Sequence, residues 1–189
     1  ERLSSVQLAG TRVRRLEVST RYGAVSTLVG RGASPSAPPV VLLHGMGSCA
    51  ADLASLLRRL RPHTSRRLAP DLPGHGHSPV PAPGLDPDRM ADQLSDALDR
   101  MLDRPAVVFG SSLGGLAGIR FAQRYPERVH SLVLASPAGA PMDADDLADF
   151  FAQLRISDNT DARRFIDQTI TRSAVPKALL AWGLRDRFN

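Results

Sequence analysis

Residues 110–114 read Gly-Ser-Ser-Leu-Gly, and this G-x-S-x-G spacing is the strongest candidate for chemistry in the sequence. An apolar run ends just before it at Phe109, and a helical pattern begins at Leu113. A serine on such a sharp strand-to-helix turn needs glycine on both sides, because the backbone is strained and the helix must pack closely on the sheet. The helix N-terminus would favour negative charge on a nearby oxygen. We therefore predict that Ser112, rather than Ser111 at the variable position, is a nucleophile.

Two further loops rich in glycine and histidine precede this turn. Residues 44–48 read His-Gly-Met-Gly-Ser, and residues 71–78 read Asp-Leu-Pro-Gly-His-Gly-His-Ser. His44 has the chemistry of a general base, and the acidic and histidine residues of the second loop have the chemistry of metal ligands. The second loop lacks a clear fourth ligand, so we interpret it as a tight turn with a structural histidine.

The order and spacing of these three loops resemble those of the α/β-hydrolases. This resemblance covers residues 11–140 and implies that Ser112 is the catalytic nucleophile. It also implies that the backbone N–H groups of Met46 and Leu113 form the oxyanion hole, where two donors stabilise a tetrahedral intermediate. By the same resemblance, His44 holds its loop and does not act as the base.

The sequence departs from the family pattern in its catalytic partners. The α/β-hydrolase triad runs serine, acid, histidine, but no histidine follows His130. Asp143 is the candidate acid. A serine without a base is a poor nucleophile, so we expect little turnover from these 189 residues and expect further chain beyond Asn189. Without that chain, the strand predicted at 129–135 would be a bare sheet edge through which the protein could self-associate.

Apolar periodicity predicts the elements that position these loops. Two short segments, Thr11–Ser19 and Ala24–Val29, predict a β-hairpin. Strand patterns at 39–43, 67–71, 105–109 and 129–135 then alternate with helical patterns at 53–60, 87–101 and 113–125, with Ser48 and Asp86 as N-caps of the first two helices and Pro87 at the start of the second. This alternation predicts an α/β fold with a mostly parallel sheet and helices on both faces.

After the last predicted strand, only helical periodicity remains. It is carried by apolar residues at positions 147–154, 165–170 and 179–184. We therefore predict two parts, an N-terminal α/β-hydrolase core at 1–140 and the start of a helical cap at 141–189, with the C-terminal core strands missing.

Composition and charge narrow the function further. The chain is 42% apolar and 23% charged, as in ordinary globular proteins, and its net charge is +5. Its basic residues, of which only Lys177 is not arginine, are scattered singly or in pairs among acidic ones, so we predict a solvated surface and no nucleic-acid partner.

No apolar run is long enough to span a membrane. The lone Cys49, expected to be a small buried residue, fits a reducing compartment, and we predict a cytoplasmic protein.

These features together predict a serine hydrolase of the esterase, acyl or carbon–carbon bond type. Its substrate would be a small molecule, an apolar acyl compound, and we expect no metal, nucleotide or flavin cofactor. An acyltransferase would share the same residues. The alternative of a different class is a non-catalytic module that keeps the α/β-hydrolase fold to bind a ligand or a partner.

Overall fold

The computed structural model describes residues 8–81, 84, 86–154, 156–169 and 177. The chain divides into two compact units, Glu1–Gly139 and Ala140–Asn189. No helix within the described ranges is long and apolar enough to cross a membrane.

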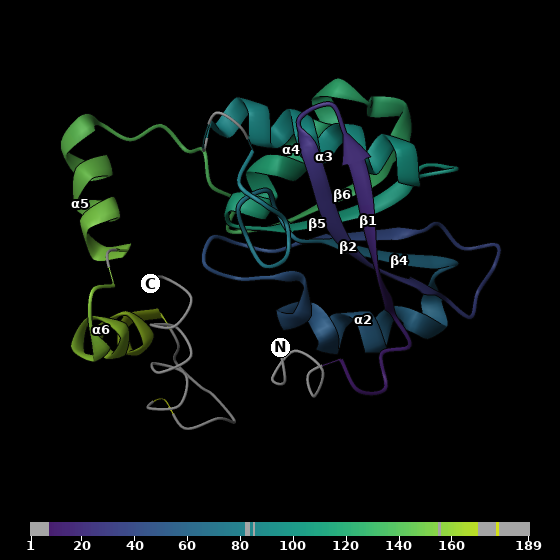
Figure 1. Ribbon diagram of the computed structural model, residues 1–189, viewed down its shortest axis with the longest axis horizontal. Coiled ribbons are helices and arrows are strands. Elements are labelled where there is room, and N and C mark those ends of the chain that lie inside the picture. Colours follow the sequence, from purple (N-terminus) through teal and green to yellow (C-terminus); the bar gives the residue numbers. More distant parts are fainter. Residues whose placement is uncertain (1–7, 82–83, 85, 155, 170–176, 178–189) are drawn as a thin grey trace. The chain divides into compact units, whose positions relative to one another are not determined.

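The first unit is built on a six-stranded sheet with the strand order β1-β2-β4-β3-β5-β6 (Figure 1). Strands β1 (Arg14–Thr20) and β2 (Gly23–Arg31) form the predicted antiparallel hairpin, and β2 is also antiparallel to β4. The other four strands run parallel: β3 (Val40–Leu43), β4 (Arg66–Pro70), β5 (Ala106–Ser111) and β6 (Val129–Ala135). The predicted hairpin and mostly parallel sheet are confirmed.

Helices cover the sheet on both faces, as the continuous apolar strands predict. Figure 1 shows α3 (Pro87–Met101) and α4 (Leu113–Arg124) on one side of the sheet and α2 (Ala54–Leu60) on the other. Short 3₁₀ turns complete the connections: η1 (Ala50–Leu53), η2 (Arg61–His63) and η3 (Pro126–Arg128). In β3, Val41 and Leu43 join the core under α3 and α4, whereas Val40 and Leu42 join the core under α2.

The helix starts show where local sequence chemistry was sufficient. Asp86 caps α3 as predicted, because its carboxylate accepts the N–H groups of Asp88 and Arg89. The predicted start of α2 was wrong. The chain first forms the 3₁₀ turn η1, and Ser48 Oγ donates to the Asp52 carboxylate instead of capping a helix. Within α2, Leu57 of the predicted buried stripe is fully buried, whereas Leu56 is 36% exposed.

Strand β6 lies at one end of the strand order and carries exposed apolar residues. Among the strands of the described chain it pairs with β5 alone. Val133 is 48% exposed and Leu134 is 39% exposed. The edge therefore has the uncovered apolar character that its sequence predicts; self-association through it stays a prediction.

The second unit is helical in the part that the structure describes. It contains α5 (Ala144–Leu154) and α6 (Asn159–Thr169), with a small core of Ile156, Ala162 and Ile166. The helical pattern expected at 179–184 lies outside the described residues.

Candidate active site

Ser112 occupies the sharp turn between β5 and α4, where the sequence places it. Its backbone has φ 51° and ψ −120°, a conformation that a residue with a side chain rarely adopts. The turn is held from the neighbouring strand, because Ser112 N–H donates to Ala135 O at 3.1 Å and Ala138 N–H donates to Ser112 O at 3.0 Å. Such strain persists only where the surroundings over-determine it, and it is typical of functional sites.

The glycines of the turn allow α4 to lie directly against the sheet. A Cβ on Gly110 would lie 2.3 Å from Gly114 O, and a Cβ on Gly114 would lie 2.4 Å from the carbonyl oxygens of Leu43 and His44. Both contacts are with backbone atoms, which cannot move aside as a flexible side chain can. The G-x-S-x-G spacing is therefore a steric requirement of this turn.

The Ser112 hydroxyl is not used to stabilise its own helix. Serine is a favoured N-cap residue, yet Ser112 makes no side-chain capping hydrogen bond to α4. Gly45 lies beside it, since a Cβ on Gly45 would be 3.3 Å from Ser112 Cβ and 3.8 Å from its Oγ. The loop that carries Met46 thus adjoins the serine, and α4 begins at Leu113, whose N–H has no intrahelical acceptor.

His44 holds the neighbouring loop through both ring nitrogens. Nε2 accepts the Leu72 N–H at 2.9 Å, and Nδ1 lies 2.8 Å from Gly45 O, so Nδ1 carries the proton and the ring is neutral. Burial is the main cause that lowers the pKa of His44 below 6.5, while the bond to Gly45 opposes this. With both nitrogens engaged, the ring cannot take a proton from Ser112 in this arrangement.

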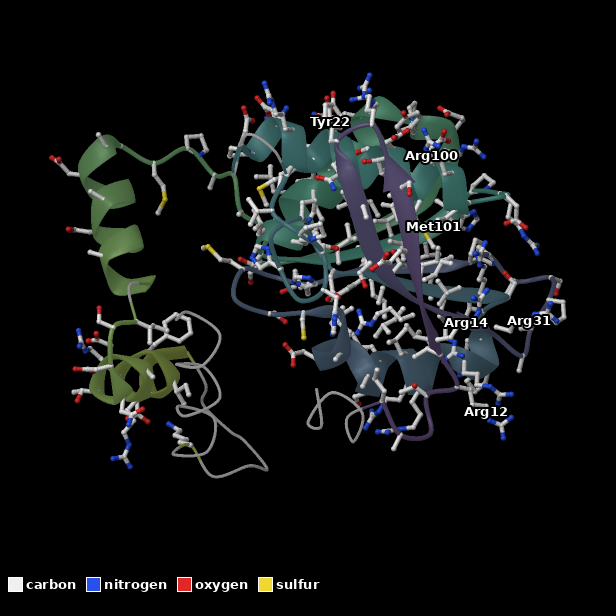
Figure 2. The ribbon with its side chains drawn as sticks, viewed as in Figure 1. Arg12, Arg14, Tyr22, Arg31, Arg100 and Met101 are labelled. Atoms are coloured by element: carbon white, nitrogen blue, oxygen red, sulfur yellow. The ribbon has the colours of Figure 1, made fainter. Side chains whose placement is uncertain are left out.

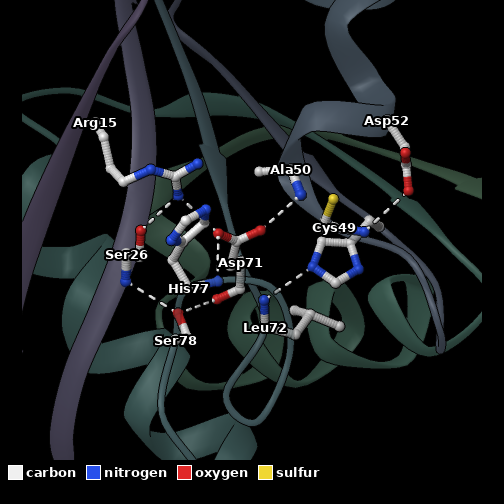
Figure 3. A network of polar contacts seen from close by, with 10 residues as sticks. Arg15, Ser26, Cys49, Ala50, Asp52, Asp71, Leu72, His77 and Ser78 are labelled. Atoms are coloured by element: carbon white, nitrogen blue, oxygen red, sulfur yellow. Dashed lines mark hydrogen bonds and ion pairs between the residues drawn. The ribbon is translucent and has the colours of Figure 1, made fainter. Parts of the chain in front are cut away.

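Asp71, at the end of β4, anchors the second glycine- and histidine-rich loop (Figure 3). Its buried carboxylate accepts the N–H groups of Ala50 at 2.7 Å and His77 at 3.1 Å, and Arg15 pairs with it at 2.9 Å. A Cβ on Gly76 would lie 2.4 Å from Asp71 Oδ1, and Gly76 has φ +53°, so the turn requires glycine. These contacts agree with the structural interpretation of the loop.

Ser78 closes the same loop onto the hairpin. Its hydroxyl donates to Asp71 O at 2.7 Å and accepts Ser26 N–H at 2.9 Å. Arg15 also donates to Ser26 Oγ at 2.7 Å. Hydrogen bonds of Ser78 therefore connect this loop to β2. Both carboxylate oxygens of Asp71 already accept hydrogen bonds.

The remaining histidines do not complete a catalytic pair. All five histidines lie in the described ranges, and no hydrogen bond there joins any of them to Ser112 Oγ. The His75 ring centroid lies 5.6 Å from that of His44, and its Nδ1 lies 3.2 Å from Pro73 O. His130 is exposed near the start of β6, the end of the strand opposite the serine turn.

Two other candidates have structural contacts. Asp143 accepts the Asp146 N–H at 2.8 Å, so the carboxylate proposed as the triad acid acts as an N-cap of α5. Cys49 is partly exposed, not buried as expected. It is the N-cap residue of η1, and its N–H donates to the Asp52 carboxylate at 3.1 Å.

With this geometry in view, the chain belongs to the alpha/beta hydrolase fold family, whose model matches residues 38–181. It is 36% identical over 152 residues to the pimeloyl-[acyl-carrier protein] methyl ester esterase of Chromobacterium violaceum, a match that covers 79% of this chain and 57% of that protein. It is 39% identical over 113 residues to Esterase Rv0045c of Mycobacterium tuberculosis, covering 59% of this chain and 36% of that esterase. The chain thus spans little more than half of the first esterase and about a third of the second.

Solved structures share the fold. A putative lipase from Acinetobacter baumannii superposes with a TM-score of 0.81 at 21% identity, covering 99% of this chain and 64% of the lipase. The naproxen esterase of Bacillus subtilis superposes with a TM-score of 0.76 at 23% identity, covering 100% of this chain and 65% of the esterase. At these identities the likeness concerns the fold alone.

Proposed function

We propose that the protein is a serine hydrolase that cleaves carboxylic esters or related acyl bonds. Ser112 attacks the carbonyl carbon, and the backbone N–H groups of Met46 and Leu113 stabilise the negative charge on the carbonyl oxygen. The observation that carries this proposal is the strained backbone of Ser112, whose φ of 51° presents a hydroxyl that caps nothing. The esterase names of the relatives support the choice of an ester as substrate.

The surroundings of Ser112 support the assignment of the oxyanion hole. Gly45 lies beside Ser112 in space, and Met46 is the next residue after Gly45 in the chain. In the described chain, no hydrogen bond uses the Met46 N–H, and the Leu113 N–H is a free donor of the first helical turn. Removing one such donor typically costs about 10²–10³ in kcat.

The base and the acid of the triad are left unassigned. His44 is engaged through both nitrogens, and Asp143 is an N-cap. The proposal therefore assigns the nucleophile and the oxyanion hole, and it gives no described residue the role of base or acid. Within the same proposal, residues 141–189 are the start of a cap whose apolar side chains favour an apolar acyl group.

Covalent labelling tests the proposal directly. The protein is exposed to a fluorophosphonate, and its intact mass and labelled peptide are determined by mass spectrometry. We expect one adduct on Ser112, loss of labelling in Ser112→Ala, and unchanged labelling in Ser111→Ala, which removes the neighbouring hydroxyl. Hydrolysis of p-nitrophenyl esters of increasing acyl length then defines the preferred chain. An adduct that persists in Ser112→Ala contradicts the assignment of the nucleophile.

A non-catalytic binding module is the second candidate, and one observation favours it. No histidine of the sequence hydrogen-bonds to Ser112 Oγ in the described chain, so nothing here activates the hydroxyl. In that case the protein remains unlabelled and hydrolyses no ester, but an apolar acyl ligand still raises its melting temperature.

A further inference from the structure

Arginine side chains gather where the parallel strands begin, at the end of the sheet opposite to Ser112. Arg31 at the end of β2 pairs in register with Arg66 at the start of β4, and Arg14 begins β1. Figure 2 shows Arg12, Arg14 and Arg31 together at one end of the hairpin. Ser112 follows the other end of the parallel strands, which at about 3.3 Å per residue are roughly 13–23 Å long.

These side chains line a depression of about 950 Å³. Its arginines come from five separate parts of the chain: Arg12, Arg14, Arg31, Arg61, Arg66 and Arg104. Asp103 supplies the single carboxylate among the described residues that line it. These arginines are scattered singly or in pairs along the chain, and the sheet brings the six of them to one surface.

Within the described ranges, the six guanidinium groups have no carboxylate partner, unlike other arginines of this unit. Elsewhere in this unit, Arg120, Arg124 and Arg128 each pair with an aspartate of α3. None of the six arginines of the depression forms an ion pair within the described chain. Among the residues that the structure describes, only two of them make hydrogen bonds through their side chains, both to backbone carbonyls: Arg66 to Met101 O at 2.6 Å and Arg104 to Pro35 O at 3.0 Å.

A seventh arginine lies behind the wall of this depression. Arg67 is fully buried, and its guanidinium donates to Thr11 O at 2.8 Å and Arg31 O at 2.9 Å. It lies against the lining residue Gly30, where an added Cβ would be 2.6 Å from Arg67 Nη2. Burial and then the positive charge of Arg61 lower the pKa of Arg67. The uncompensated charge therefore costs stability, and a bound anion would offset that cost.

We propose that this depression binds a small anion that carries two or more linked phosphate groups. Guanidinium groups bind phosphate oxygens through paired, charge-assisted hydrogen bonds, and one phosphate cannot engage six of them. The depression has the volume of a small-molecule site. The site is separate from Ser112, and the proposal does not depend on the hydrolase activity.

Calorimetric titration with tripolyphosphate tests this site, with orthophosphate compared at equal ionic strength. We expect orthophosphate to bind at least about tenfold more weakly. The double variant Arg14→Gln/Arg31→Gln removes two exposed guanidinium groups that form no hydrogen bond or ion pair in the described chain, and it should weaken tripolyphosphate binding by at least about tenfold. The control Arg21→Gln/Arg89→Gln removes the same charge outside the depression and should change binding less than about twofold.

Several outcomes would overturn the proposal. One is the absence of tripolyphosphate binding by the native protein, and another is an equal loss in the two double variants, which would show an unspecific effect of net charge. Binding of single-stranded DNA or of phosphatidylglycerol vesicles without tripolyphosphate binding would indicate an extended surface for a macromolecule or a membrane. Ser112→Ala should bind tripolyphosphate as the native protein does, so the two proposals fail independently.

Discussion

The loops after β4 and β5 both follow the carboxyl ends of parallel strands. They differ in whether their polar side chain is used in hydrogen bonds. After β4, the Asp71 carboxylate accepts two backbone N–H groups and an arginine. After β5, Ser112 is held at positive φ with a hydroxyl that caps nothing. The first loop stabilises the fold, whereas the second stores strain and keeps a reactive group available. Chemistry is therefore expected at the less satisfied of the two loops.

The largest effect should come from Asp71→Ala. Removing the carboxylate leaves the buried Ala50 N–H without its acceptor and Arg15 without its partner, so we expect a loss of about 3 kcal/mol or more in the free energy of unfolding. Urea denaturation measures it. Asp88→Ala, which removes an exposed ion pair with Arg120, should cost less than about 1 kcal/mol. Equal losses of unfolding free energy in the two variants would show that the buried network stabilises the fold no more than an exposed ion pair does.

Gly114→Ala should have the next largest effect. Its methyl group would meet the carbonyl oxygens of Leu43 and His44 at 2.4 Å, so α4 must move away from the sheet, at a cost of about 2–3 kcal/mol. Gly118→Ala on the same helix is the control, because its Cβ would meet only side-chain atoms, the nearest at 3.3 Å. Thermal unfolding of the two variants distinguishes them. A larger loss in Gly118→Ala would contradict the role given to the glycines of the turn.

His44 should make the first loop sensitive to pH. Its folded pKa lies below 6.5, chiefly because of burial, so the unfolded chain binds the proton more tightly than the folded chain. Stability from His44 is complete above pH 6.5 and is lost as the pH falls through the folded pKa. Urea denaturation at pH 7.5 and pH 5.5 should show this loss. His44→Gln keeps an acceptor for Leu72 N–H but does not titrate, so a decline of the same size in this variant would exclude His44 as the cause.

The smallest effect should come from Ser112→Gly. Glycine adopts positive φ without strain, so the variant should be more stable than the native protein. The higher conformational entropy of glycine in the unfolded chain opposes this gain, so we expect a net increase of about 1 kcal/mol or less in the free energy of unfolding. Ser111→Gly, at the end of β5, has no such strain to relieve and should be destabilised by about 0.5–1 kcal/mol. Chemical denaturation compares them. Destabilisation of both variants to the same degree would argue against strain at Ser112.

Local patterns were sufficient where local physics decides the structure. The serine turn, the hairpin and the capped start of α3 follow from glycine spacing, alternation and the Asp86–Pro87 pair, since each depends on residues that are neighbours in the chain. The start of α2 could not be foreseen, because Ser48 had a second partner in Asp52 that competed with the helix cap.

The sequence by itself thus determined the class of fold, the presence of the helices α5 and α6, and the residue offered as nucleophile. Only the tertiary structure decided that Asp71 and His44 are occupied by hydrogen bonds, and that the six arginines of the depression share one surface. The physical reason is the strand order. Antiparallel pairing of β2 with β4 places Arg31 opposite Arg66, residues whose separation in the chain gives no sign that they meet.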